Sequence, residues 1–145
     1  MKSSPEVTET VFDNLRFALH SRGSLEFRIS GKSMLPLIKP GAMIQLEPLR
    51  GSPEKFDILV VRSERALLGH YVWHLNELSA VEGERTILTR GLNRNLDDLP
   101  VPLTSVLGRV TNYRIGFFRR LYLNLRAAWK ARELQAWPSR SGRRS

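Results

Sequence analysis

The run Asp57-Ile58-Leu59-Val60-Val61, followed by Leu67-Leu68-Gly69-His70-Tyr71-Val72-Trp73-His74-Leu75, decides the fold class. Both stretches are short and rich in the aliphatic, β-branched and aromatic residues that strands favour. Similar stretches lie on either side of them, separated by glycine and proline turn signals. The other expected strands are Leu25–Ile29, Met43–Leu46, Thr86–Thr89 and Ser105–Tyr113. Many short strands of this kind predict a mainly β domain with a curled, barrel-like antiparallel sheet.

Two helices are expected to flank this sheet. Between residues 6 and 21 apolar side chains recur at helical spacing, and Gly23 provides a stop signal. The recurring positions are Val7, Val11, Leu15 and Ala18, with Leu19 beside them. A second helix is expected over Phe117–Trp137, followed by a Ser-, Arg- and Gly-rich end that we expect to be disordered. The chain is thus divided into an N-terminal amphipathic helix at 1–23, a β domain at 24–113, and a basic amphipathic helix with a disordered tail at 114–145.

The composition excludes several kinds of site. The 145 residues include no cysteine, which removes disulfides, thiolate nucleophiles and cysteine-based zinc sites. No apolar run approaches the roughly 18 residues that a membrane span needs. The N-terminal segment Met1–Val11 is polar and mixed in charge, unlike a secretory signal. We therefore expect a cytoplasmic protein of bacterial type.

The positive charge is concentrated at the C-terminal end. The formal net charge is +9, of which residues 113–145 carry +8, through eight arginines and one lysine against the single acid Glu133. Any anionic partner is therefore expected to bind this end of the chain. A helix–turn–helix needs more than the one helix that precedes the first strand, so sequence-specific binding to nucleic acid is not expected.

The run Ser30-Gly31-Lys32-Ser33-Met34-Leu35-Pro36 contains the candidate nucleophile, Ser33, where a strand breaks into a loop. Gly31 allows the backbone to turn sharply, and Pro36 stiffens the far side of the loop. Backbone N–H groups near Ser33 can then point at a developing oxyanion. Serines in such loops are usually turn residues, so a catalytic role depends on a base that takes the hydroxyl proton.

Lysine is disfavoured as that base by its positions. The lysines are Lys2, Lys32, Lys39, Lys55 and Lys130. None lies between Lys55 and the C-terminal helix, where the strands facing Ser33 should fall. The side chain of Lys32 should leave an extended backbone on the face opposite Ser33. A Ser–Lys dyad is therefore improbable, and histidine becomes the better candidate.

The histidines are His20, His70 and His74. His20 ends the first helix, where a cation is favoured by the helix dipole. His70 and His74 share one strand and, at period two, should face the same side of it. If that side is the core, one or both could be hydrogen-bonded structural histidines, so the choice of base stays open from spacing alone.

Asp97 and Asp98 are the candidates for a carboxylate that orients the imidazole. Both close the loop that begins at Gly91, and turn capping is their alternative interpretation. His70 and His74 have no nearby third ligand for a metal, and no glycine-rich phosphate loop occurs. No metal or organic cofactor is implied.

Four segments carry a resemblance to a known group. They are Gly31-Lys32-Ser33-Met34-Leu35-Pro36-Leu37-Ile38 with Pro40-Gly41, the strand Phe56–Val61, the strand Leu67–Leu75, and Thr89-Arg90-Gly91 through Asp98-Leu99-Pro100-Val101 to Val106-Leu107-Gly108-Arg109-Val110. Together they resemble the serine peptidase clan that contains type I signal peptidases and the self-cleaving LexA-like repressors. The resemblance spans about residues 25–112. The chain departs from the clan's pattern at Ala42, Tyr71 and Leu92, where the pattern has Asp, Arg and Asp.

The resemblance implies a LexA- or signal-peptidase-like curled barrel and a Ser–His peptidase. Ser33 would be the nucleophile, His70 the base and Asp98 the acid that holds it, with Asp97 as the alternative acid. His70 is preferred to His74 because the residues around it are apolar, as in that strand of the clan. The implied substrate is a peptide or protein, such as a leader segment, cleaved through an acyl-enzyme.

A second hypothesis is a catalytically degraded module of the same fold that binds membrane or nucleic acid through its basic tail. Large apolar residues share one broad face of residues 115–130, and Arg119, Arg126 and Lys130 follow one flank of it. This pattern is typical of a helix at an anionic membrane surface. A helix that packs on the β domain would show the same apolar face. We therefore expect a peripheral position at the inner membrane surface as an alternative to a wholly cytoplasmic one.

Overall fold

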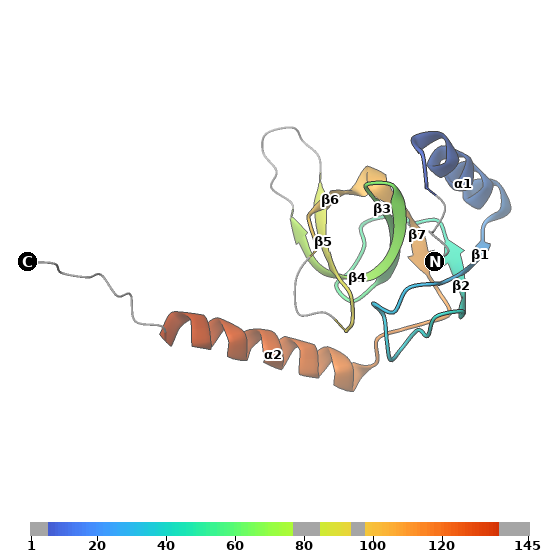
Figure 1. The fold of residues 1–145 in the computed structure, drawn as a ribbon. Helices are drawn as coiled ribbons and strands as arrows, with labels where there is room; N and C mark the ends of the chain where they lie inside the picture. The colour runs from blue at the N-terminus through green and yellow to red at the C-terminus, as the bar shows by residue number, and fades with distance from the viewer. Residues whose placement is uncertain (1–5, 77–84, 94–97, 137–145) are drawn as a thin grey trace, which may run out of the picture. The chain divides into compact units, whose positions relative to one another are not determined.

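The computed structural model describes residues 6–76, 85–93 and 98–136. It is mainly β, with seven strands in one antiparallel sheet and two α-helices, which confirms the prediction of a mainly β domain with two helices (Figure 1). The elements are α1 (Glu9–Arg22), β1 (Leu25–Arg28), β2 (Met43–Glu47), β3 (Ile58–Ser63), β4 (Ala66–Asn76), β5 (Thr86–Arg90), β6 (Val101–Pro102), the 3₁₀ turn η1 (Leu103–Ser105), β7 (Val106–Val110) and α2 (Phe117–Ala136). Neither of the two described α-helices has the length and apolar character that crossing a membrane requires.

The chain forms two compact units, Met1–Arg114 and Ile115–Ser145. The first contains the whole sheet together with α1, and the second contains α2. The candidate site residues all belong to the first unit.

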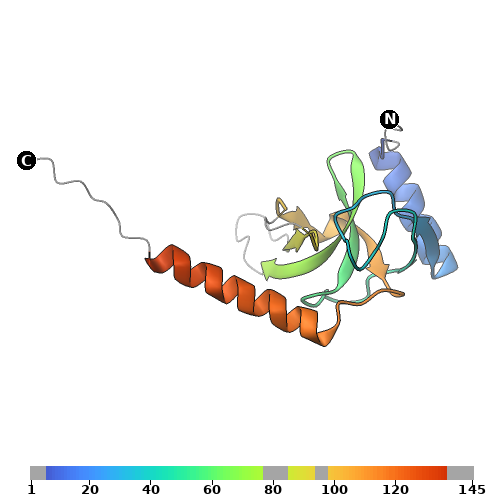
Figure 2. The ribbon, with the colours of Figure 1, turned by 60° about the horizontal axis from the view of Figure 1, so that its bottom comes forward.

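The sheet has the strand order β1-β2-β7-β3-β4-β5-β6. In Figure 2 the orange strand β7 runs beside the green part of the chain, in agreement with its pairing with β3. β7, the last strand in the sequence, lies between β2 and β3, so the end of the β domain is built into its centre. Within the described residues, β1 and β6 form the two edges and do not pair with each other, so the sheet is not closed. The more specific expectation of a barrel is therefore not confirmed.

The strand boundaries agree with the sequence expectations to within three residues, with one omission. No strand is expected between Thr89 and Ser105, but Val101–Pro102 form the short strand β6. Its pairs with β5 are Ile87↔Val101 and Thr86↔Pro102. An edge strand tolerates Pro102 because it does not need to donate a hydrogen bond on its outer side. The apolar core beneath these strands contains Leu59, Val61, Val72, Ile87, Val101 and Val106.

Helix α1 is fixed at both ends and packs on the centre of the sheet. The Thr8 side chain accepts a hydrogen bond from the Val11 N–H, and Gly23 ends the helix in a left-handed conformation with φ of 80°. Leu19 is fully buried and reaches β7 at Gly108. A Cβ at Gly108 would stand 2.5 Å from the Glu47 carbonyl oxygen and 2.9 Å from the Leu19 side chain. Only glycine therefore allows this close approach of helix and strand.

Strand β4 contains an irregularity that corrects a sequence expectation. Its pairing with β5 shifts between Val72 and His74, as in a β-bulge at Trp73. Before the shift Val72 pairs with Thr89, and after it His74 pairs with Leu88. Paired residues share a face, and Thr89 and Leu88 point to opposite faces because they are consecutive. The prediction that His70 and His74 face the same side is therefore wrong.

Candidate active site

Ser33 lies in the tight loop that follows β1. The loop is held by buried apolar side chains at Met34 and Ile38 and by backbone turns, with the Ile38 N–H donating to the Met34 carbonyl at 3.0 Å. The Leu35 N–H donates to the Lys32 carbonyl at 3.1 Å. Ser33 itself is half-buried, whereas the neighbouring Lys32 is exposed. Burial of its neighbours fixes the Ser33 backbone while its hydroxyl remains accessible.

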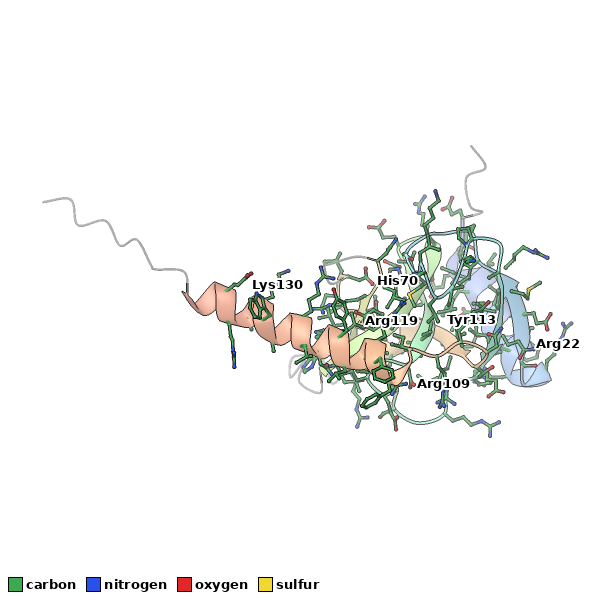
Figure 3. The ribbon with its side chains drawn as sticks, turned by 90° about the horizontal axis from the view of Figure 1, so that it is seen from below. Arg22, His70, Arg109, Tyr113, Arg119 and Lys130 are labelled. Carbon is green, nitrogen blue, oxygen red and sulfur yellow. The ribbon has the colours of Figure 1, made fainter. Side chains whose placement is uncertain are left out.

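His70 lies on β4, between β3 and β5, and is 2% exposed. Its side chain is labelled in Figure 3. Its Nε2 is 3.0 Å from the Ser33 Oγ, and its Nδ1 contacts the Asp98 Oδ2. An ionised carboxylate only accepts hydrogen bonds, so Nδ1 carries the proton and donates it to Asp98. Nε2 is then the acceptor, and the Ser33 hydroxyl donates to it. The three residues form one continuous hydrogen-bonded chain across 65 positions of sequence.

Asp98 is held in place by β5. Its Oδ2 accepts a hydrogen bond from the Thr89 hydroxyl at 2.8 Å, and its backbone N–H donates to the Thr89 carbonyl at 3.0 Å. Thr89 is 1% exposed and lies on the face of β5 that it shares with the core residue Ile87. The carboxylate is therefore oriented by a buried hydroxyl as well as by the imidazole. Sequence reasoning assigned no role to Thr89, although the period-two alternation of β5 could have placed it beside the site.

Two residues after β5 complete the site and were also missed. The Asn93 backbone N–H donates to the Ser33 carbonyl at 3.1 Å, and its side-chain amide donates to the Lys32 carbonyl at 2.8 Å. A Cβ at Gly91 would stand 3.1 Å from the Cβ and carbonyl oxygen of Ser33 and 3.4 Å from the His70 Nε2. Asn93 thus binds the backbone of the nucleophile loop, and Gly91 leaves space for that loop beside the imidazole. No sequence pattern indicates such long-range contacts.

The structure distinguishes among the candidate bases and acids that the sequence left open. His74 is exposed and lies on the other side of the bulge from His70. His20 is also exposed, and its Nδ1 is 2.8 Å from the Arg16 carbonyl within α1. Lys55, the last lysine before the C-terminal helix, lies 4.0 Å from the Trp73 ring. Asp97 lies outside the described residues. Ser33, His70 and Asp98 are the predicted residues that the structure brings together.

A pocket of about 160 Å³ opens beside Ser33. Its lining is mostly apolar and comes from the end of β1, the nucleophile loop and the strands β2, β3 and β4. The lining residues are Phe27, Arg28, Ile29, Ser30, Gly31, Ser33, Ile44, Val60, Leu67, Leu68 and Gly69. A single apolar side chain of a bound ligand could occupy this space next to the Ser33 hydroxyl.

The backbone N–H of Ser33 is available for an anion. Within the part of the chain that the structure describes, it donates to no protein acceptor. In the same described residues, no cluster of three or more His, Asp or Glu side chains has the arrangement of a metal site. The chemistry offered by these residues is that of a hydrogen-bonded hydroxyl, imidazole and carboxylate.

Comparisons with protein-family models, with curated proteins and with solved structures find no match to this chain. The resemblance to the signal peptidase and LexA-like clan therefore depends on the quoted segments. The assignment of a function depends on those segments together with the geometry of the site.

Proposed function

We propose that this protein is a serine peptidase that hydrolyses peptide bonds with Ser33 as nucleophile, His70 as general base and Asp98 as the residue that orients His70. One observation carries the proposal: the Ser33 Oγ is 3.0 Å from the His70 Nε2, and Asp98 contacts the other nitrogen of the same ring. Ser–His–Asp triads of this kind are recognised by their geometry and roles, independently of sequence order.

Each proton has a defined route in this arrangement. The Ser33 Oγ attacks the carbonyl carbon of the scissile peptide bond while its proton passes to the His70 Nε2. The negative charge that develops on the carbonyl oxygen is stabilised by the Ser33 backbone N–H. The imidazolium then donates its proton to the leaving amine, the C–N bond breaks, and an acyl-enzyme remains. Water, deprotonated by His70, hydrolyses the ester and restores the serine.

The surroundings of the imidazole support its role as a base. His70 is almost completely buried, and its charged form needs a compensating negative group at that depth. Asp98 supplies that group and fixes the tautomer, and Thr89 in turn fixes Asp98. The arrangement stabilises the imidazolium at the step in which it forms.

The likeness to signal peptidases and LexA-like repressors supports a peptide substrate and, at the level of fold, a curled sheet related to theirs. The apolar pocket beside Ser33 suits an apolar side chain next to the scissile bond. Its lining includes residues at the end of the edge strand β1, where an extended peptide could bind alongside the backbone. Processing of a leader or signal-like segment is the reaction class that fits these features.

Covalent labelling tests the proposal. A fluorophosphonate probe reacts with an activated serine, which displaces fluoride and forms a phosphonyl ester. We expect intact-mass analysis to show one addition to the full-length protein, with peptide mapping placing it on Ser33. The variant Ser33→Ala should remain folded by circular dichroism and show no addition. Peptidase activity on an optimised substrate should fall by about 10⁴–10⁶-fold in the same variant.

The matched control is Ser30→Ala, which removes a hydroxyl from the same loop, three residues before the nucleophile. Ser30 also lines the pocket, but the hydroxyl that donates a hydrogen bond to the His70 Nε2 belongs to Ser33. Labelling should persist in this control. A folded parent protein that resists labelling, or labelling that survives in Ser33→Ala, contradicts the proposal. The first of these results would favour the non-catalytic module.

A further inference from the structure

Helix α2 has an exposed apolar face, which its own polar side chains do not cover. At about 100° per residue, six large apolar residues fall within an arc of about 140°. They are Phe117, Phe118, Leu121, Tyr122, Leu125 and Trp129, and each is between 46% and 83% exposed. Phe117 and Phe118 contact each other edge to face, with ring centroids 5.7 Å apart. A helix with this much exposed aromatic and aliphatic surface is typical of a binding surface.

Basic residues border this face on both sides. Arg119, Arg126 and Lys130 fall within about 40° of one another along one border, next to Tyr122. Arg120 lies along the other border, and its Nε donates to the Ile115 carbonyl at 2.7 Å. Arg132 falls inside the apolar arc in the last part of the helix, where its long side chain can extend its charge away from an apolar surface. The helix thus combines an apolar centre with cationic margins.

The acidic side chain of the helix is already engaged. The Trp129 indole N–H donates to the Glu133 Oε1 at 3.0 Å. Five basic residues against this one acid leave α2 strongly cationic. Tyrosine and tryptophan at the margin of an apolar face are also the residues enriched where membrane meets water.

We propose that α2 binds the surface of an anionic lipid bilayer, lying in the plane of the headgroups with Phe118, Leu121 and Leu125 toward the acyl chains. Charge complementarity identifies this occupant. A second copy of the helix would bring two sets of basic residues together, which opposes dimerisation through this face. Nucleic acid would pair with the arginines but would leave Leu121 and Leu125 without an apolar partner. Anionic lipid satisfies both the charge and the apolar arc. The inference does not depend on the activity of Ser33.

Vesicle sedimentation of the full-length protein tests this surface. We expect binding to vesicles of phosphatidylcholine with phosphatidylglycerol at low salt, and much weaker binding to phosphatidylcholine alone. Leu125→Gln removes an apolar anchor without changing charge or helix propensity, and should weaken binding about tenfold or more. Ala131→Gln is the matched control, because Ala131 is exposed outside the apolar arc and should leave binding within about twofold. Anionic vesicles should also shift the tryptophan emission to shorter wavelength, and Trp129→Phe should reduce the shift.

Four results would overturn the proposal. The folded parent protein could fail to bind anionic vesicles, or Leu125→Gln and Ala131→Gln could weaken vesicle binding equally. Alternatively, Leu125→Gln could unfold or aggregate the protein, or it could abolish a dimer and leave vesicle binding unchanged. Equal effects would mean that charge alone drives adsorption, and unfolding would mean that the face belongs to a core. Fluorophosphonate labelling of Ser33 should be unchanged in both variants, so this surface and the proposed catalysis can fail independently.

Discussion

The two histidines of β4 are four residues apart in one strand and lie in opposite environments. His70 is buried and joins Ser33 to Asp98, whereas His74 is exposed beyond the shift in pairing. The shift occurs at Trp73, whose ring has the Lys55 ammonium and the Arg90 guanidinium each at 4.0 Å. Burial lowers the pKa of Lys55, and the positive charge of Arg90 lowers it further. The alternation of side chains between the two faces of a strand therefore no longer predicts the face of a residue that follows a bulge. Bulges are common next to active sites.

The candidate base, His70, lies in the first half of β4, before the bulge, and His74 lies in the second half. Before the bulge, β4 pairs in register with β3, where His70 lies opposite Leu59 and Gly69 opposite Val60. A histidine held in this central ladder has little freedom to move. His74, which follows the bulge, is exposed instead. Three substitutions test the role of His70 and of the groups that surround it.

The largest effect is expected for His70→Ala. Without the imidazole the Ser33 hydroxyl loses its base, so the rate of fluorophosphonate labelling should fall by about 10⁴–10⁶-fold. His74→Ala is the matched control in the same strand, and its labelling rate should stay within about twofold of the parent protein. If the two results were exchanged, the role of base would pass to His74 and the geometry proposed for His70 would be wrong.

Asp98→Asn should have the next largest effect, a fall of about 10⁴-fold in the labelling rate. The amide is nearly the same shape, but it offers an N–H as well as an oxygen to the ring and no longer fixes the tautomer with the proton on Nδ1. The thermal midpoint should change far less than the rate, because the variant keeps the Thr89 backbone contact. A variant that labels at the parent rate would show that Asp98 has only a structural role.

Gly91→Ala should have the smallest effect of the three, about 10²-fold in the labelling rate. The added methyl group would lie 3.1 Å from the Ser33 Cβ and carbonyl oxygen, so the nucleophile loop must shift slightly from the imidazole. A matched control is Gly31→Ala, where an added Cβ meets nothing within 4 Å and φ lies outside the left-handed region. Equal rates for both variants would mean that the loop accommodates the shift without losing its geometry.

The mainly β class and both helices could be predicted from the amino-acid sequence, and Ser33, His70 and Asp98 could be named from it as candidate site residues. Runs such as Ile58–Val61 have a local composition that favours strands, and Gly23 is a local stop signal for a helix, so neither depends on distant contacts. The exclusion of lysine and the setting of Ser33 in a Gly/Pro loop were also local arguments. The choice of Asp98 and of His70 came from the resemblance, and their catalytic roles stay predictions.

How these residues meet follows from the tertiary structure alone. The bulge at Trp73 depends on the register between β4 and β5, and the roles of Thr89, Gly91 and Asn93 depend on which strand end lies beside the nucleophile loop. Within the described residues β7 lies between β2 and β3, and the edge strands β1 and β6 do not pair, so the sheet is not closed, whereas the sequence suggested a barrel. Register and strand order arise from pairings between distant segments, and the composition of a single segment contains little information about its partner.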